Sequence, residues 1–259
     1  DVAVTPSEHF NTVLYTGNGG TNAITGVGFQ PDFTWIKQRS NADSNVVFDA
    51  VRGVHKRLVT DATATEADWT SVDKGLDVFS SDGFTVKDDT DGNYSVNKNT
   101  GTFVAWNWKA NGSGSSNTDG TITSTVSANT DAGFSIVSYT GNGSDGATIG
   151  HGLSSAPEIV IFKSRSAAAS WATFGYPNNP AFPNDGSVLL LDDTSAMGNS
   201  TSKEVSIGSS TITLVDAGGD IGTSGDDYIA YCFHSVDGYL KCGSYIGNGN
   251  ADGTFVYTG

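Results

Sequence analysis

The sequence predicts an all-β protein made of tandem antiparallel β-sandwiches of the jelly-roll or lectin-like kind. A short phrase ending in a glycine-rich turn recurs along the chain. Short runs with strand alternation are separated by turn signals about every 8 to 12 residues, and helical periodicity is almost absent. The 259 residues include 33 glycines, as expected for many tight turns between short strands.

The recurring phrase reads Tyr-Thr-Gly-Asn-Gly at Tyr15 and Tyr139 and Tyr-Ile-Gly-Asn-Gly at Tyr245. Each copy follows a strand-like run, so it resembles the end of a strand entering a turn. Longer segments also align when the chain is shifted by about 124 positions, as a tandem repeat requires. The aligned segments are 26–40 with 150–166 and 103–109 with 228–234. Two units and the beginning of a third follow from this self-similarity.

The repeat sets the expected domain boundaries. We expect the first sandwich over residues 1–112 and the second over 131–237. Residues 113–130, rich in Gly, Ser, Asn and Thr, are expected to form a flexible linker. Residues 238–259 are expected to hold the first strands of a third, incomplete repeat. Units of this kind would follow one another as beads and expose loops at both ends.

In the first unit, apolar runs predict a series of short strands and little else. The segment 33–37 is apolar on both faces, as expected of a strand between two layers. Residues 62–68 are the only stretch with helical character. The expected strands are 10–15, 33–37, 46–48, 58–60, 78–79, 84–86 and 103–109.

The strand expected at 103–109 alternates cleanly between two faces. One face carries Val104, Trp106 and Trp108, and the counterpart face within 228–234 is also apolar. Aromatic rows on a strand can stack on sugars, but a face that is bulky and apolar in both copies favours a packed interior.

The second unit has the same character, with one long loop. Residues 176–186 contain three prolines in seven positions, which excludes helix and central strand. Tyr176 and Phe182 in this loop are candidate ligand contacts, and a simple surface crossover is the alternative. The expected strands are 134–138, 159–163, 171–174, 188–191, 205–207, 212–215 and 228–234.

Four cationic residues recur at matched positions where a strand gives way to a loop, namely Lys37, Arg39, Lys163 and Arg165. One interpretation is internal salt bridges to nearby Asp, such as Asp32 or Asp49. The other is a cationic contact for acidic sugars or lipopolysaccharide phosphate, because the guanidinium fork fits such anions.

No cofactor is expected, and calcium is only a weak candidate. Asp88, Asp89, Asp91 and Asn93 offer oxygen ligands, but no Glu stands at the twelfth position of an EF-hand loop. Elsewhere the excess of Asp is explained by turn chemistry.

Cys232 and Cys242 flank a short turn around residues 236–238. A three-residue hairpin loop would place the two cysteines opposite each other, where they can form a disulfide, whereas a two-residue loop would offset them. Both outcomes remain open from the sequence.

Charge and motifs exclude several functional classes. Thirteen basic against 28 acidic residues give a net charge of −15, which disfavours nucleic-acid binding. No apolar run approaches the roughly 20 residues needed to cross a bilayer, so membrane insertion is not expected. The four histidines share no metal-ligand spacing and no nucleophile motif occurs, so we expect no enzymatic activity. His151, between two glycines, is expected to face solvent.

Several segments of the first unit together resemble the repeat found in tail-fibre and related structural proteins of marine tailed phages, cyanophages especially. They are 6–19, 26–32, 35–37, 48–53, 81–84 and 103–109. The second unit matches more loosely and departs from the pattern at 173–176. The resemblance implies a virion surface protein and supplies no catalytic residue.

These observations lead to a non-enzymatic tail-fibre or adhesin segment on the virion surface. It would present loops to a host cell-surface glycan or lipopolysaccharide, contact other virion proteins and form a homo-oligomer. A structural spacer or capsid decoration protein without its own ligand is one alternative, and a glycan depolymerase of the tail-spike type is another.

Overall fold

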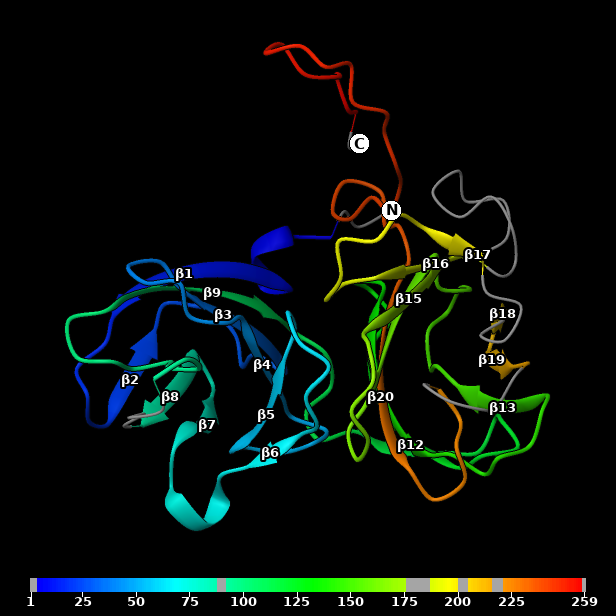
Figure 1. Ribbon diagram of the computed structural model, residues 1–259, viewed down its shortest axis with the longest axis horizontal. Coiled ribbons are helices and arrows are strands. Elements are labelled where there is room, and N and C mark those ends of the chain that lie inside the picture. Colours follow the sequence, from blue (N-terminus) through cyan, green and yellow to red (C-terminus); the bar gives the residue numbers. More distant parts are fainter. Residues whose placement is uncertain (1–3, 88–91, 176–186, 200–204, 216–220, 258–259) are drawn as a thin grey trace.

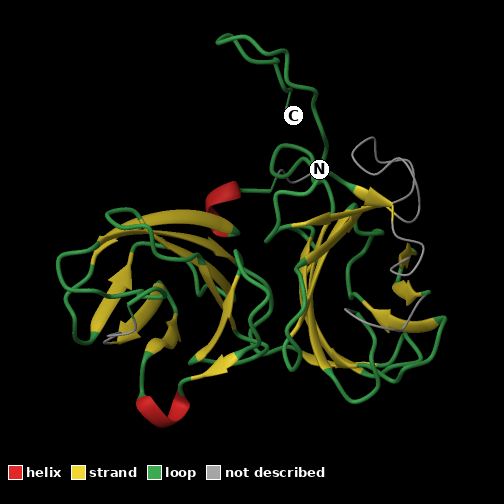
Figure 2. Ribbon diagram, in the orientation of Figure 1, coloured by secondary structure: helices red, strands yellow, loops and turns green. Residues whose placement is uncertain are grey.

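The computed structural model describes residues 4–87, 92–175, 187–199, 205–215 and 221–257 (Figure 1). This part of the chain consists of antiparallel strands and loops, with short 3₁₀ helices at η1 (Pro6–Glu8) and η2 (Thr70–Val72) (Figure 2). The all-β prediction is confirmed. Neither described helix has the length or apolar character needed to cross a membrane.

The first half of the chain forms two sheets that enclose a core containing Phe48, Phe84 and Phe103. Alternating apolar positions on each strand supply this core. The large sheet has the order β1 (Phe10–Thr16), β9 (Thr102–Trp108), β3 (Phe33–Gln38), β4 (Val46–Asp49), β5 (Lys56–Val59) and β6 (Ala67–Asp68). The small sheet has the order β2 (Asn22–Thr25), β8 (Gly83–Lys87) and β7 (Gly75–Ser80).

The second half forms a matching pair of sheets around a core that includes Phe162, Phe174 and Tyr228. The large sheet has the order β10 (Ser115–Asn117), β11 (Ser124–Asn129), β12 (Phe134–Thr140), β20 (Asp227–Phe233), β14 (Ile159–Ser164), β15 (Ala172–Gly175), β16 (Ser187–Leu190) and β17 (Gly198–Asn199). The small sheet has the order β13 (Ala147–Gly150), β19 (Thr211–Leu214) and β18 (Val205–Ile207).

The two halves share one topology. From β12 onward the second large sheet repeats the strand order of the first, and β13-β19-β18 repeats β2-β8-β7. Side-chain contacts repeat as well: Tyr15 stacks on Phe103 at 5.0 Å between ring centroids, and Tyr139 stacks on Tyr228 at 5.3 Å. Both hydroxyls donate hydrogen bonds to backbone carbonyls in the loop before the central strand. The repeated sequence phrase therefore marks a repeated structural element.

The glycine that follows each Tyr-Thr pair packs directly against this same loop. The Gly17 N–H donates to the Gly101 carbonyl and the Gly141 N–H to the Asp226 carbonyl, each at 2.8 Å. A Cβ atom at Gly17 would lie 2.2 Å from the Lys98 carbonyl oxygen, so the backbones can approach only because no side chain intervenes.

Residues 113–130 are not a flexible linker, which corrects the sequence-based expectation. They contain β10 and β11, and β11 pairs with β12 through Val126 opposite Val137. Ile122 and Val126 are buried in the core of the second half, and these apolar positions hold an otherwise polar segment against the sheet. The helix considered at residues 62–68 is also absent, because this segment runs as loop into β6.

Residues 238–257 form no strand of the kind expected for a third repeat. The single bridge there joins Val236 to Leu240. Their counterparts β1 and β12 each pair with a central strand, β9 or β20, and the described chain offers no third strand of this type. Residues 243–257 project away from both halves (Figure 1), with large side chains such as Tyr245 and Phe255 exposed.

The large sheets of the two halves pack against each other, which corrects the picture of separate beads (Figure 1). A third apolar cluster fills the space between them, with Phe33, Val47 and Leu58 from the first half. Trp171 and Tyr231 contribute from the second half. Because large aromatic side chains are buried there, this interface forms a third hydrophobic core between the two sandwiches.

Replacement of Gly17 or Gly141 by Ala should destabilise the protein by about 1–3 kcal/mol, because the new methyl group meets a carbonyl oxygen in a packed turn. Urea denaturation monitored by tryptophan fluorescence measures the change. Gly253→Ala is the matched control, since nothing lies within 4 Å of a Cβ atom there. Equal stability of all three variants would contradict the role given to the turn.

Candidate functional site

The candidate site lies on the outer face of the first large sheet, where that sheet meets the second half of the chain. Along β9, Phe103 and Ala105 point into the first sandwich, and Val104, Trp106 and Trp108 point outward. The outward face was expected to be a packed interior; its counterparts Ile229 and Tyr231 in the second half are indeed buried, but they pack between the two large sheets and not inside their own sandwich. The inner side of the central strand takes Phe103, Ala105 and the buried Asn107, and the outer aromatics are covered only in part, by the other large sheet.

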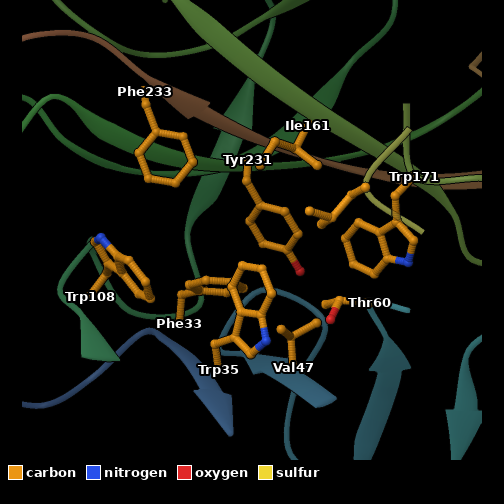
Figure 3. Close-up of a pocket in the computed structure, with 10 residues that line it drawn as sticks. Phe33, Trp35, Val47, Thr60, Trp108, Ile161, Trp171, Tyr231 and Phe233 are labelled. Carbon is orange, nitrogen blue, oxygen red and sulfur yellow. The ribbon is translucent and has the colours of Figure 1, made fainter. Parts of the chain in front are cut away.

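A pocket of about 50 Å³ opens between the two large sheets (Figure 3). Its walls are aromatic or aliphatic apart from Thr60, and they come from both halves of the chain. The first half contributes Phe33, Trp35, Val47, Thr60 and Trp108, and the second half contributes Ile161, Trp171, Leu191, Tyr231 and Phe233. Apolar walls of this kind are typical of a small-molecule site.

Trp35 lines this pocket, and Trp106 is its cross-strand neighbour on the same sheet face; we call this tryptophan pair the rim. They stand opposite each other on β3 and β9, with ring centroids 6.4 Å apart in an edge-to-face arrangement. Both are half-buried, and the sheet face continues to Val104 and to Leu14, which is 63% exposed. The Nε1–H group of Trp35 is buried and has no hydrogen-bond partner among the described residues. The rim therefore offers apolar area to a ligand, since the unpaired indole donor is buried.

An ionic network borders the pocket and ties the two halves together. The Tyr231 hydroxyl donates to the Asp49 carboxylate at 2.7 Å, and that carboxylate also accepts from Nε of Arg52. Glu66 accepts from Arg52 at 3.0 Å and, through both of its oxygens, from Arg165 at 3.0 and 2.9 Å. One carboxylate of the first half thus joins guanidinium groups of both halves.

The ionisation of this network follows from its surroundings. Burial alone would raise the pKa of Glu66, but hydrogen bonds from Arg165 and the charge of Arg52 lower it below its usual value. Burial would likewise lower the pKa of Arg52, yet the adjacent Asp49 carboxylate raises it overall. Burial raises the pKa of Tyr231 well above 10, so its hydroxyl keeps its proton and donates to Asp49. The network is charged at neutral pH.

Lys163 and Arg165, predicted as ligand contacts, are structural residues. Lys163 is fully buried and donates to the carbonyls of Ser164 and Thr63, the latter from the other half. Arg165 is occupied by Glu66 as described above. The alternative of internal salt bridges therefore holds for Arg165, with a Glu in place of an Asp as its partner.

The other two cationic residues lie apart from the pocket lining. The Lys37 ammonium donates to the Asp43 carbonyl, and Arg39 is exposed at the end of β3. Asp32 and Asp49, the expected salt-bridge partners, bind elsewhere: Asp32 accepts from the Ala110 N–H, and Asp49 from Arg52. The structure does not bring the four predicted cations together into one site.

Several predicted site residues lie outside the described part of the chain. These are Tyr176, Phe182, Asp88, Asp89 and Asp91. Asn93, the remaining member of the calcium candidate, is exposed, and its backbone carbonyl accepts from the Ser44 N–H.

Cys232 and Cys242 are free thiols, so the disulfide considered from the sequence is not formed. Val236 bridges to Leu240, and extending this register places Cys242 opposite His234 and not opposite Cys232. Burial raises the pKa of Cys232 to about 12 and that of Cys242 to about 11, so both stay protonated at neutral pH.

His151 is buried and does not face solvent as expected. Its Nδ1 accepts from the Leu153 N–H at 3.1 Å, which leaves Nε2–H to donate to the Gly208 carbonyl at 3.3 Å. Burial lowers its pKa, consistent with a neutral structural side chain.

Sequence reasoning missed Trp35 and Glu66 as site residues. Trp35 aligns with Ile161 in the second unit, so the sequence signal that could have identified it was a tryptophan present in only one of the two units. Glu66 is one of only four glutamates in the chain, but its partners Arg52 and Arg165 are not close to it in sequence.

Comparison with known protein families identifies a match. A family model described as Domain of unknown function (DUF7483) matches residues 5–259. No curated protein and no solved structure matches the chain.

Glu66→Gln should lower the free energy of unfolding by on the order of 3 kcal/mol, because it leaves Arg165 without its carboxylate partner and removes one of the two carboxylates that bind the buried Arg52. Urea denaturation provides the measurement. Lys56→Gln is the control: its ion pair with Asp68 spans 3.9 Å between partly exposed side chains and contributes less than about 1 kcal/mol. A Glu66→Gln effect no larger than the control would show that the network does not hold the halves together.

Acid should weaken the interface through the same carboxylate. Because the pKa of Glu66 is lowered in the folded protein, its stabilisation is complete above its unfolded pKa of about 4.3 and is lost as the pH falls through the lower folded value. Urea midpoints between pH 7 and pH 3 should fall more steeply for the wild type than for Glu66→Gln. Parallel curves for the two proteins would exclude this contribution.

Proposed function

We propose that this chain, which belongs to the DUF7483 family, is a non-catalytic attachment module that binds neutral surface glycans on the outer face of β3 and β9. One observation carries the proposal: two half-buried tryptophans, Trp35 and Trp106, are cross-strand neighbours on this face, and Trp35 also lines an aromatic pocket. This arrangement suits a ligand with both an apolar face and hydroxyl groups.

The rim and the pocket would contact different parts of a sugar. A pyranose ring has a face of C–H groups that packs on an indole ring, while its hydroxyl groups can stay on the solvent side. The pocket volume of about 50 Å³ is too small for a whole ring. It suits a small apolar substituent, such as a methyl or the methyl of an acetyl group, while the ring lies across Trp106 and Trp35.

Charge favours a neutral ligand. The chain carries a net charge of −15, and Lys163 and Arg165, which would have served an acidic sugar, are bound within the interface. The pocket lining contains no charged side chain among its described residues. The acidic surface repels anionic polysaccharides and phosphates, so a neutral glycan fits better than lipopolysaccharide phosphate.

The resemblance to tail-fibre repeats supports a place on a virion surface, where the glycan would belong to the host cell. A single shallow site of this kind binds weakly, so attachment would depend on several copies acting together in a homo-oligomer or along a fibre. Other virion proteins would hold those copies in place.

Trp106→Ala and Trp35→Ala should each weaken glycan binding at least tenfold, about 1.4 kcal/mol, because each removes stacking area at the rim. A glycan array with the oligomerised wild-type protein identifies the ligand, and titration calorimetry with that glycan compares the variants. Tyr245→Ala removes an exposed aromatic side chain far along the C-terminal segment and serves as the control. Wild-type protein that binds no neutral glycan, or rim variants that bind as the control does, would contradict the proposal.

A further inference from the structure

We infer that His55, Asp73 and Asp77 form a binding site for a divalent transition-metal ion, of which Zn²⁺ is the best fit. The site is separate from the aromatic pocket and independent of the proposed glycan binding. His55 immediately precedes β5, Asp73 ends η2, and Asp77 lies within β7. The backbone holds these elements together, since the His55 N–H donates to the Leu76 carbonyl at 2.8 Å.

The spacing of the three side chains suits a tetrahedral ion. Nε2 of His55 lies 3.2 Å from an Asp77 carboxylate oxygen and 3.8 Å from an Asp73 carboxylate oxygen, and all three ligand atoms lie within 4.8 Å of one another. Zinc bonds of 2.0–2.1 Å at tetrahedral angles place neighbouring ligand atoms about 3.3 Å apart. The distance from His55 to Asp77 already meets this spacing. The Asp73 side chain is 61% exposed and is free to move the remaining few tenths of an ångström toward His55.

The imidazole is oriented as a metal ligand would be. Its Nδ1 lies 2.7 Å from the Lys74 carbonyl oxygen, which can only accept, so Nδ1 carries a proton and donates. Nε2 is thereby turned toward two carboxylates, which are also acceptors. A cation bound between these three groups would give all of the facing acceptor atoms a common partner. In metal sites, a ligating histidine usually donates its other ring N–H to a carboxylate or a backbone carbonyl, as His55 does here.

Lys87 provides the competing cation. Its ammonium donates to both oxygens of Asp73 at 2.9 and 2.7 Å and lies 3.4 Å from an Asp77 oxygen. This pair holds the carboxylates in place without a metal, and a bound ion would displace the ammonium into solvent. Metal affinity is therefore the outcome of a competition, and removing the charge of Lys87 should raise it.

The chemistry of the donors selects the metal. One imidazole nitrogen with two carboxylates suits Zn²⁺ better than Ca²⁺, which prefers six or more oxygen ligands. Three protein ligands leave a fourth position for water. Binding would link the turn before β5 to the β7–β8 hairpin and stabilise the first half of the chain.

Titration calorimetry of the chelator-treated full chain with ZnCl₂ at pH 7 tests the inference. The wild type should bind one Zn²⁺ and melt at a higher temperature when Zn²⁺ is present. Asp73→Asn, at the exposed position, and His55→Ala should each weaken binding at least tenfold, and Lys87→Met should tighten it several-fold. His9→Ala, which changes a histidine elsewhere, should bind as the wild type does.

Three results would each overturn the site. The first is no Zn²⁺ binding by the wild type at about 0.1 mM, the weakest affinity of interest. The others are Asp73→Asn binding Zn²⁺ as tightly as the wild type does, and a preference of the wild type for Ca²⁺. Because Asp73 is exposed, its variant should fold even where His55→Ala does not. Near-identical circular dichroism spectra of Asp73→Asn and wild type confirm that comparison.

Discussion

The packing of the two large sheets against each other is the interaction on which the rest of the structure depends. Each sandwich has its own core, but the central strands also carry bulky apolar side chains on their outer faces. On β20 these are Ile229, Tyr231 and Phe233, and burying them requires a second apolar surface. The outer face of the first sheet supplies that surface, and because the overlap is incomplete, part of its aromatic row remains open to solvent.

Polar contacts fix how the two sheets meet. The Trp171 indole donates to the Val59 carbonyl at 2.7 Å, and Glu66 holds Arg165 through both oxygens. These directional bonds set the register of an interface that apolar packing alone would leave adjustable. They also bind cations that an acidic chain could otherwise have offered to an anionic ligand. The same interface therefore shapes the pocket and biases its choice of ligand.

The sequence was sufficient for properties that depend on local pattern. The Tyr-Thr-Gly-Asn-Gly phrase marks equivalent turns because Gly17 and Gly141 meet carbonyl oxygens in the same way. The sequence was not sufficient where long-range packing decides the outcome. Alternation on β9 separates two faces, but only the position of the second sheet determines which face is covered. Residues 113–130 are polar in composition, so the sequence did not predict β11, which is fixed by its pairing with β12. No local signal links Glu66 to Arg165.

The central claim, that both sandwiches form one packed body, is tested most directly by hydrogen exchange of the Trp171 indole N–H, followed by NMR. This group is buried and donates across the interface to Val59. If the sheets pack as described, its exchange should be slowed by on the order of 100-fold or more relative to a tryptophan in an unstructured peptide. Exchange at the peptide rate would show that the interface is open in solution and that the two sandwiches behave as separate units.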